Sequence, residues 1–125
     1  GNGGSAADAQ HIAAELSGRF CIDRKPLNAE ALHVNSSFVT AVANDYGFEN
    51  IYSRMIEAVG RKGDVLFGIS TSGNSINVIN AIDNEKEFEK YLFKYNFSFS
   101  KYVREKLIKT PQRPEIENFK KINTD

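Results

Sequence analysis

Apolar runs alternate with helix-type patterns through the first two thirds of the chain. The clearest strand is predicted over residues 64–69, because its apolar positions leave neither face polar, as in a parallel sheet covered on both sides. A second, shorter strand is predicted over residues 27–34. Strands that alternate with helices favour a layered α/β fold around a parallel sheet. Helices are predicted over residues 5–20, 37–44, 49–59 and 77–90.

Two of these helices allow finer predictions. Ser5 is a good N-cap for the first helix, because its hydroxyl can accept from the backbone N–H groups at a helix start. The second helix is expected to bury one apolar face. The residues on that face are Phe38, Val39, Ala41 and Val42.

The last third of the chain follows a different pattern. Aromatic residues occupy every second position over residues 91–99, which favours a strand there over the continuation of an aromatic-rich helix. Residues 85–90 and 101–109 have helical composition. From Thr110 onward, prolines and polar residues predict a poorly ordered tail.

Length and composition exclude several classes of function. The 125 residues suit one domain, and 16 Lys plus Arg balance 16 Asp plus Glu, so no strong field attracts nucleic acid or anionic membrane. The single cysteine, Cys21, excludes a disulfide framework and predicts a reducing compartment. Neither a signal sequence nor an apolar run of membrane-spanning length is visible. A cytoplasmic protein is expected, with neither nucleic acid nor membrane as a partner.

Two glycine-containing segments are suited to binding an anion. Asn2, Gly3 and Gly4 open the first helix, where backbone N–H groups and the helix dipole favour negative charge. Residues 70–75, Ser-Thr-Ser-Gly-Asn-Ser, connect the clearest strand to a helix, the usual ligand position in open α/β sheets. Their hydroxyl and amide groups can hold phosphate oxygens without a cation. The alternatives are a plain capped turn in the first case and a polar turn in the second.

A histidine and a carboxylate lie four residues apart in the first predicted helix. His11 and Glu15 therefore share one face, and such a pair can bind a divalent metal or act as acid and base. A surface hydrogen-bonded pair is the ordinary alternative. Asn44 and Asp45 form a milder candidate pair, for which a helix C-cap and turn is the alternative.

Four blocks of the sequence occur together in a recognisable order, at residues 1–11, 14–20, 44–48 and 68–75. Together they resemble the sedoheptulose-7-phosphate isomerases of the sugar isomerase (SIS) domain superfamily. The resemblance covers residues 1–82 and implies a three-layer, flavodoxin-like α/β sandwich with a parallel sheet. Two predicted strands are too few for such a sheet, so either strands are missing or a partner supplies them. Because the family's first strand and its later helix with Gln and His are not seen, we expect the domain to be incomplete at both ends. Residues 83–125 are expected to form a divergent segment, partly helical with a disordered tail.

The resemblance also implies an activity and a role for each candidate residue. The family interconverts D-sedoheptulose 7-phosphate and D-glycero-D-manno-heptose 7-phosphate, toward the heptose of lipopolysaccharide or capsule. His11 and Glu15 would be two zinc (Zn2+) ligands, with Glu15 also moving a proton between adjacent carbons. Asn2, Asn44 and Asp45 would contact the sugar, together with Gly3, Gly4 and Glu15. The expected phosphate site consists of Ser70, Thr71, Ser72 and Ser75.

One part of the family pattern is absent from the sequence. A later helix of the family supplies a Gln and a His that complete the metal site, whereas residues 83–125 contain no histidine and Gln112 stands alone. The leading prediction is an isomerase that works as a homotetramer, with neighbouring subunits completing its sites, or that descends from an active enzyme. The alternatives are a non-catalytic SIS module that binds a sugar phosphate or a protein, and an unstable gene fragment.

Overall fold

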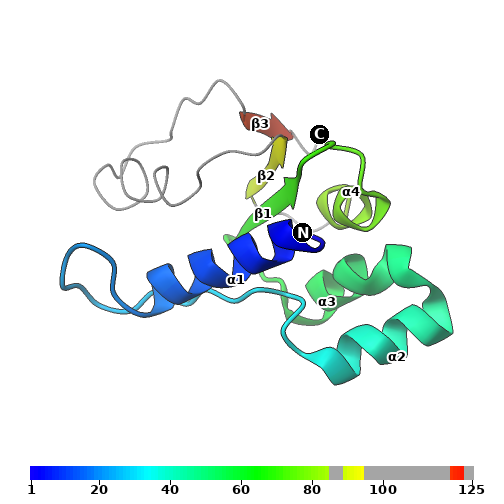
Figure 1. Cartoon of the computed structure of the whole chain (residues 1–125), viewed down its shortest axis with the longest axis horizontal. Coiled ribbons are helices and arrows are strands. Elements are labelled where there is room, and N and C mark those ends of the chain that lie inside the picture. Colours follow the sequence, from blue (N-terminus) through cyan, green and yellow to red (C-terminus); the bar gives the residue numbers. More distant parts are fainter. Residues whose placement is uncertain (85–88, 95–118, 123–125) are drawn as a thin grey trace.

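The computed structural model describes residues 1–84, 89–94 and 119–122 (Figure 1). None of the helices in these residues has the length and apolar character that a membrane crossing requires. The elements in chain order are helix α1 (Gly4–Ser17), α2 (Ser36–Tyr46), the 3-10 helix η1 (Phe48–Asn50), α3 (Ile51–Val59), strand β1 (Val65–Ser70), α4 (Ile76–Ile82), β2 (Glu89–Lys94) and β3 (Phe119–Ile122).

The three strands form one sheet in the order β1-β2-β3. β1 and β2 run parallel, with Val65 opposite Glu89 and Ser70 opposite Lys94. β2 and β3 run antiparallel, with Phe93 opposite Phe119. The α/β class and the parallel pairing are confirmed, and β3 makes the sheet mixed.

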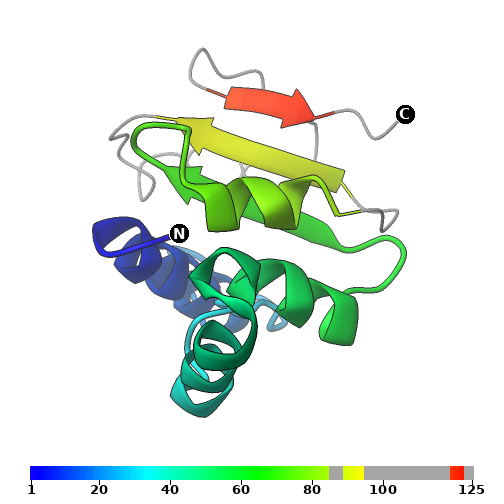
Figure 2. The ribbon, with the colours of Figure 1, turned by 90° about the vertical axis from the view of Figure 1, so that its right-hand side faces the viewer.

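The helices pack on the sheet in a fixed sequence. α4 lies against β1 and β2, α3 packs against α4, and α2 packs against α3 and η1 (Figure 2). α1 lies against β1 (Figure 1). The main core therefore sits between the sheet and α2–α4, and its buried residues are Val42, Ile51, Tyr52, Ile56, Val78, Ala81, Ile82 and Leu92.

A glycine sets the distance between β1 and α4. A Cβ atom added at Gly68 would lie 2.6 Å from Cδ1 of Ile82 and 2.9 Å from Cγ1 of Val78. Both distances are shorter than carbon atoms tolerate, so only glycine lets the helix approach this closely. The position of α4 over the end of β1 thus depends on one residue without a side chain.

The predicted strand over residues 27–34 is wrong. No strand is present there, and the backbone hydrogen bonds of the segment form no ladder. Leu27 N–H donates to the carbonyl of Leu16 in the last turn of α1 at 3.1 Å, and Val34 N–H donates to that of Ala31 in a turn at 3.4 Å. Leu27 and Val34 are half exposed, while Ala31 is buried. The apolar residues of this segment therefore do not share one buried face.

The predicted boundaries near the end of the core also need correction. The helix predicted over 77–90 ends at Ile82, and Lys90 lies in β2 opposite Leu66. The aromatic strand predicted from residue 91 begins at Glu89, and its part beyond Lys94 lies outside the described residues, as do the helix predicted over 101–109 and residues 85–88. β3 lies within the predicted tail, where pairing with β2 outweighs the polar composition.

Two predictions about single helical residues are wrong as well. Ser5 does not cap α1: the N-cap is Gly3, and Ser5 is buried inside the first turn. Ala41 is exposed, whereas Ala43 packs against the core with Phe38 and Val39. Ala43 follows Val39 by four residues and so shares its face of α2, which Ala41 does not.

Candidate functional site

The first glycine-containing segment, residues 2–4, is a tight turn that opens α1. Gly3 has φ 53° and ψ −121°, a conformation that side-chain-bearing residues rarely adopt. The turn closes through Ser5 N–H, which donates to the carbonyl of Asn2 at 3.0 Å, and Ala7 N–H, which donates to that of Gly3 at 3.1 Å. No side chain caps this helix start. Its positive dipole end is therefore open to a ligand.

The second segment, residues 70–75, is called the serine loop below, and it connects β1 to α4. Ser70 is 3% exposed, and its hydroxyl lies 2.9 Å from that of Ser75 and accepts from Gly73 N–H at 3.1 Å. The Ser72 hydroxyl accepts from Asn74 N–H at 3.1 Å. Gly73 allows this compact path with a φ of 70°. Thr71 is exposed. The loop is thus a cluster of hydroxyl groups over the carboxyl end of β1, where an α/β sheet binds ligands.

A pair of side-chain amides brings the two segments together. Asn2 Nδ2 donates to Asn77 Oδ1 at 2.9 Å, and Asn77 Nδ2 donates back to Asn2 Oδ1 at 2.8 Å. Asn77 is 2% exposed and lies in the first turn of α4, two residues after Ser75. The segment of residues 2–4, called the glycine turn below, and the serine loop are about seventy residues apart in the sequence. The two are therefore neighbours in space.

Asn77 is not among the functional residues predicted from the sequence. One signal was available, because asparagine is unfavourable inside helices and is usually found at caps and turns. A buried asparagine at the second position of α4 therefore needed a specific partner. That partner, Asn2, could not be inferred from local sequence.

Tyr52 of α3 is a second residue that sequence reasoning missed. Its hydroxyl donates to the carbonyl of Gly1, next to the glycine turn, and the side chain is 5% exposed. Burial raises the pKa of Tyr52, which keeps the phenol protonated and able to donate. α3 and α4 thus hold the glycine turn from two sides.

His11 and Glu15 form a contact on α1, as their spacing predicts. His11 Nε2 lies 3.1 Å from Glu15 Oε1, and the two side chains are 66% and 23% exposed. The other carboxylate oxygen, Glu15 Oε2, is buried and finds no hydrogen-bond partner within the described part of the chain. Burying a carboxylate oxygen without a partner costs free energy of folding. This atom is therefore suited to take up a proton, to accept a hydrogen bond from a hydroxyl group or to bind a metal ion.

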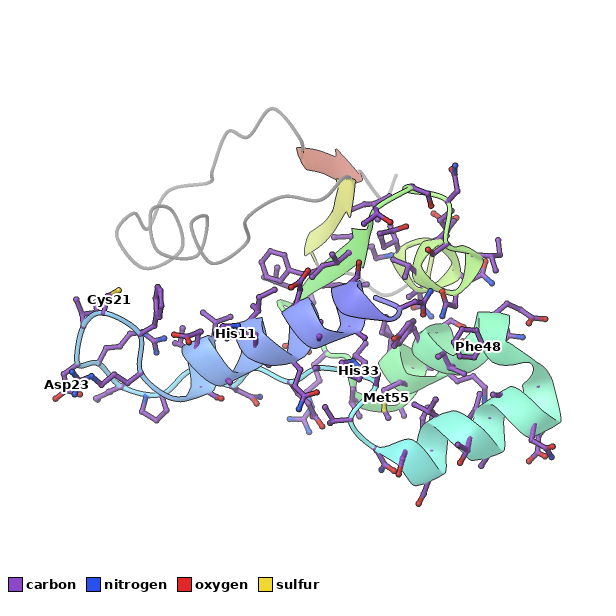
Figure 3. All side chains as sticks on the ribbon, viewed as in Figure 1. His11, Cys21, Asp23, His33, Phe48 and Met55 are labelled. Atoms are coloured by element: carbon purple, nitrogen blue, oxygen red, sulfur yellow. The ribbon has the colours of Figure 1, made fainter. Side chains whose placement is uncertain are left out.

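The His11–Glu15 pair lies away from the glycine turn along α1. A helical rise of about 1.5 Å per residue places Glu15 roughly 16 Å along the axis from Gly4. The turn and the serine loop occupy one end of the helix, and the pair lies two to three turns further on. Figure 3 shows His11 near the middle of α1.

The two side chains fit a zinc ion only as part of a site. Two ligands of one tetrahedral zinc ion stand about 3.3 Å apart, close to the His11–Glu15 separation. A catalytic zinc ion takes three protein ligands. Within residues 1–84, 89–94 and 119–122, no cluster of three or more His, Cys, Asp or Glu could hold a metal. The described residues therefore offer at most two of the ligands.

Asn44 and Asp45 lie in the last turn of α2, outside these groups. Asn44 Nδ2 donates to Asp45 Oδ1 at 2.9 Å, and both residues are exposed. α2 packs against η1 and α3 (Figure 1). The structure thus joins Asn2, Gly3 and Gly4 to the serine loop, whereas the side chains of Asn44 and Asp45 bond to each other.

Comparisons with known proteins agree on one family. The family model described as "SIS domain" matches residues 1–92. The chain is 60% identical over 87 residues to the phosphoheptose isomerase of Mycobacterium tuberculosis, and the aligned residues cover 70% of this chain and 44% of that protein. It is 57% identical over 89 residues to the phosphoheptose isomerase of Helicobacter pylori, and the aligned residues cover 71% of this chain and 46% of that protein. The chain thus spans less than half the length of these curated relatives.

Solved structures show the same similarity. A phosphoheptose isomerase from Neisseria gonorrhoeae superposes with a TM-score of 0.68 at 50% identity, over 75% of this chain and 49% of that one. One from Francisella tularensis gives a TM-score of 0.70 at 36% identity, over 74% and 50%. The arrangement of α1–α4 around the sheet is therefore a known one.

Proposed function

The chain belongs to the SIS domain family, and from this premise we propose that it is an isomerase acting on a heptose 7-phosphate. The reaction is the interconversion of D-sedoheptulose 7-phosphate and D-glycero-D-manno-heptose 7-phosphate, for heptose biosynthesis. The relatives named phosphoheptose isomerase support this choice. The structural observation that carries it is the Glu15 carboxylate, with one oxygen on His11 and the other buried and unpaired.

The serine loop is proposed to hold the phosphate group. It contains three serine hydroxyls and leads into the first turn of α4, whose N-cap residue Ser75 does not cap the helix with its side chain. The hydroxyls are neutral donors, and the helix start adds a positive dipole end. Asn2, Gly3 and Gly4, fixed beside it through Asn77, are proposed to contact the sugar. Binding the phosphate far from the reacting carbons supplies positioning energy for the reaction.

Glu15 is proposed to move the proton. Aldose–ketose isomerisation transfers a proton between adjacent carbons through an enediol, and a carboxylate with a free oxygen can take it from one carbon and return it to the other. His11 holds the second oxygen of Glu15 and so fixes the orientation of the carboxylate. A zinc ion would take the place of that hydrogen bond between His11 and Glu15, with further ligands from beyond the described residues, and would polarise the sugar carbonyl.

We also propose that the chain works as a homo-oligomer. The roughly 16 Å along α1 between the glycine turn and Glu15 favours a site that combines the serine loop of one copy with the His11–Glu15 pair of another. Asn44 and Asp45, which are exposed at the end of α2, are also proposed to contact the sugar. A homotetramer is the assembly that the resemblance implies.

Glu15→Gln tests the proposed base. The amide keeps the size of the side chain but cannot accept the proton, so turnover of sedoheptulose 7-phosphate should fall by about 10²–10⁴-fold while its Kd changes little. Zinc content is measured in parallel. Glu30→Gln, the same change at an exposed carboxylate, is the control and should leave turnover unaltered. Full turnover in Glu15→Gln would exclude Glu15 as the base.

The incomplete set of metal ligands in the described residues favours a second candidate function. A SIS module that binds a sugar phosphate without converting it needs the serine loop but not a complete metal site. Calorimetry that shows binding of sedoheptulose 7-phosphate, with no turnover in the presence of zinc, would select this candidate.

A further inference from the structure

We propose that Asn77 is a positioning residue that fixes the glycine turn against the serine loop and thereby gives the site its preference for a sugar phosphate over phosphate alone. The inference rests on the proposed function, since it concerns how the same site holds its ligand. It assigns a role to a residue of α4 that lies behind the loop.

The hydrogen bonds of Asn77 leave its side chain no freedom. Its Oδ1 accepts from Asn2 Nδ2 at 2.9 Å and from Val78 N–H at 3.0 Å, which uses both lone pairs of that oxygen. Its Nδ2 donates to Asn2 Oδ1 at 2.8 Å. With the residue 2% exposed, water cannot replace these bonds, and rotating the amide would break all of them.

The same bonds fix the start of α1. Asn2 precedes Gly3, and the carbonyl of Asn2 accepts from Ser5 N–H in the first turn of that helix. Holding the Asn2 side chain therefore holds the backbone of the glycine turn. Asn77 lies only two residues beyond Ser75, so a single side chain sets the spacing between the turn and the serine loop.

This spacing matters for only one kind of ligand. A molecule with both a phosphate and a sugar touches the serine loop and the glycine turn together, and gains affinity when the two are already in place. Inorganic phosphate touches the loop alone and gains nothing from the turn. Asn77 engages one N–H and one lone pair of the Asn2 side-chain amide. At most one N–H and one lone pair of that amide are left for a sugar hydroxyl, and their orientation is fixed.

The test compares two probes in calorimetry, sedoheptulose 7-phosphate and inorganic phosphate. The unaltered chain should bind the sugar phosphate more tightly. In Asn77→Ala, affinity for the sugar phosphate should fall about tenfold, while that for phosphate should change less than about twofold. Asn80→Ala is the matched control: Asn80 is the same residue type on the same helix, but it donates to the carbonyl of Glu49, and its loss should alter neither affinity.

Asn2→Ala gives a second route if Asn77→Ala does not fold. It removes the same amide pair, leaves the bond between Asn77 and Val78 intact and also removes the sugar contact proposed for Asn2, so its selective loss should be at least as large. If both single variants fold, the double variant should bind no more weakly than Asn2→Ala, because Asn77 acts on the ligand only through Asn2.

Each contrary result has a distinct meaning. Equal loss of both affinities in Asn77→Ala would show that the residue only supports α4, and an unchanged preference would show that it does not position the turn. Additive losses in the double variant would also overturn the proposal. If the unaltered chain binds neither probe, the proposed function itself fails.

Discussion

The glycine turn depends on the unusual conformation of one glycine and on two side chains that bond to its backbone or to Asn2. Gly3 adopts φ 53° and ψ −121°, whereas Gly4 lies in the regular first turn of α1, where an added Cβ would meet no atom within 4 Å. Tyr52 and Asn77 hold the turn from α3 and α4. The site is therefore built on backbone geometry that a few side chains stabilise.

Replacing the two adjacent glycines should have opposite effects on stability. Gly3→Ala places a Cβ in a strained conformation and should lower the free energy of unfolding by about 1–3 kcal/mol. Gly4→Ala should raise it by about 0.5–1 kcal/mol, since alanine is favoured in helices. Urea titration of both variants measures the effects. Equal effects at the two positions would mean that the conformation of Gly3 is not needed.

Among the helices and strands, two contacts decide where α1 ends and how α4 packs. Arg24 donates to the carbonyls of Glu15 at 2.8 Å and Leu16 at 2.9 Å, and so closes the C-terminal end of α1. Gly68 sets the approach of α4 to β1. The first contact stabilises the turn that contains Glu15, and the second places α4 at the serine loop.

Gly68→Ala should separate β1 from α4. The added methyl would overlap Ile82 and Val78, so we expect a loss of about 1–3 kcal/mol in the free energy of unfolding. Ile82→Val removes the closest atom and alone should cost about 0.5–1.5 kcal/mol. The double variant should lose less stability than the sum of the losses in the two single variants, because the smaller valine leaves room for the added methyl group. Chemical denaturation measures all three values. Simple additivity would mean that Gly68 and Ile82 are not in contact.

The protein as a whole should unfold more readily in mild acid because of His33. Burial lowers the pKa of His33 below its ordinary value of 6.5. Between the two pKa values the unfolded chain binds more protons than the folded chain, so stability falls as the pH drops from 6.5 toward the folded pKa.

His33→Gln should flatten this part of the pH profile. Glutamine cannot take up the proton, so the free energy of unfolding of the variant should change less between about pH 7 and mild acid than that of the unaltered chain. Denaturation at a series of pH values compares the two. Parallel profiles would show that His33 titrates equally in both states.

Local sequence patterns were enough to predict the α/β class, the four helices, strand β1, the serine loop and the contact between His11 and Glu15. These features follow from patterns a few residues long: apolar periodicity, glycine at turns and the four-residue spacing of a helix face. A four-residue spacing places two side chains together wherever the helix lies. The family resemblance likewise rests on short blocks.

Packing in three dimensions, by contrast, set the Asn2–Asn77 pair, the hold of Tyr52 on the glycine turn, the coil at residues 27–34 and the pairing of β3 with β2. Each depends on which groups meet after the chain has folded, and the two amides are 75 residues apart in the sequence. Local pattern states what a residue prefers, but a buried polar group takes whichever partner packing brings to it.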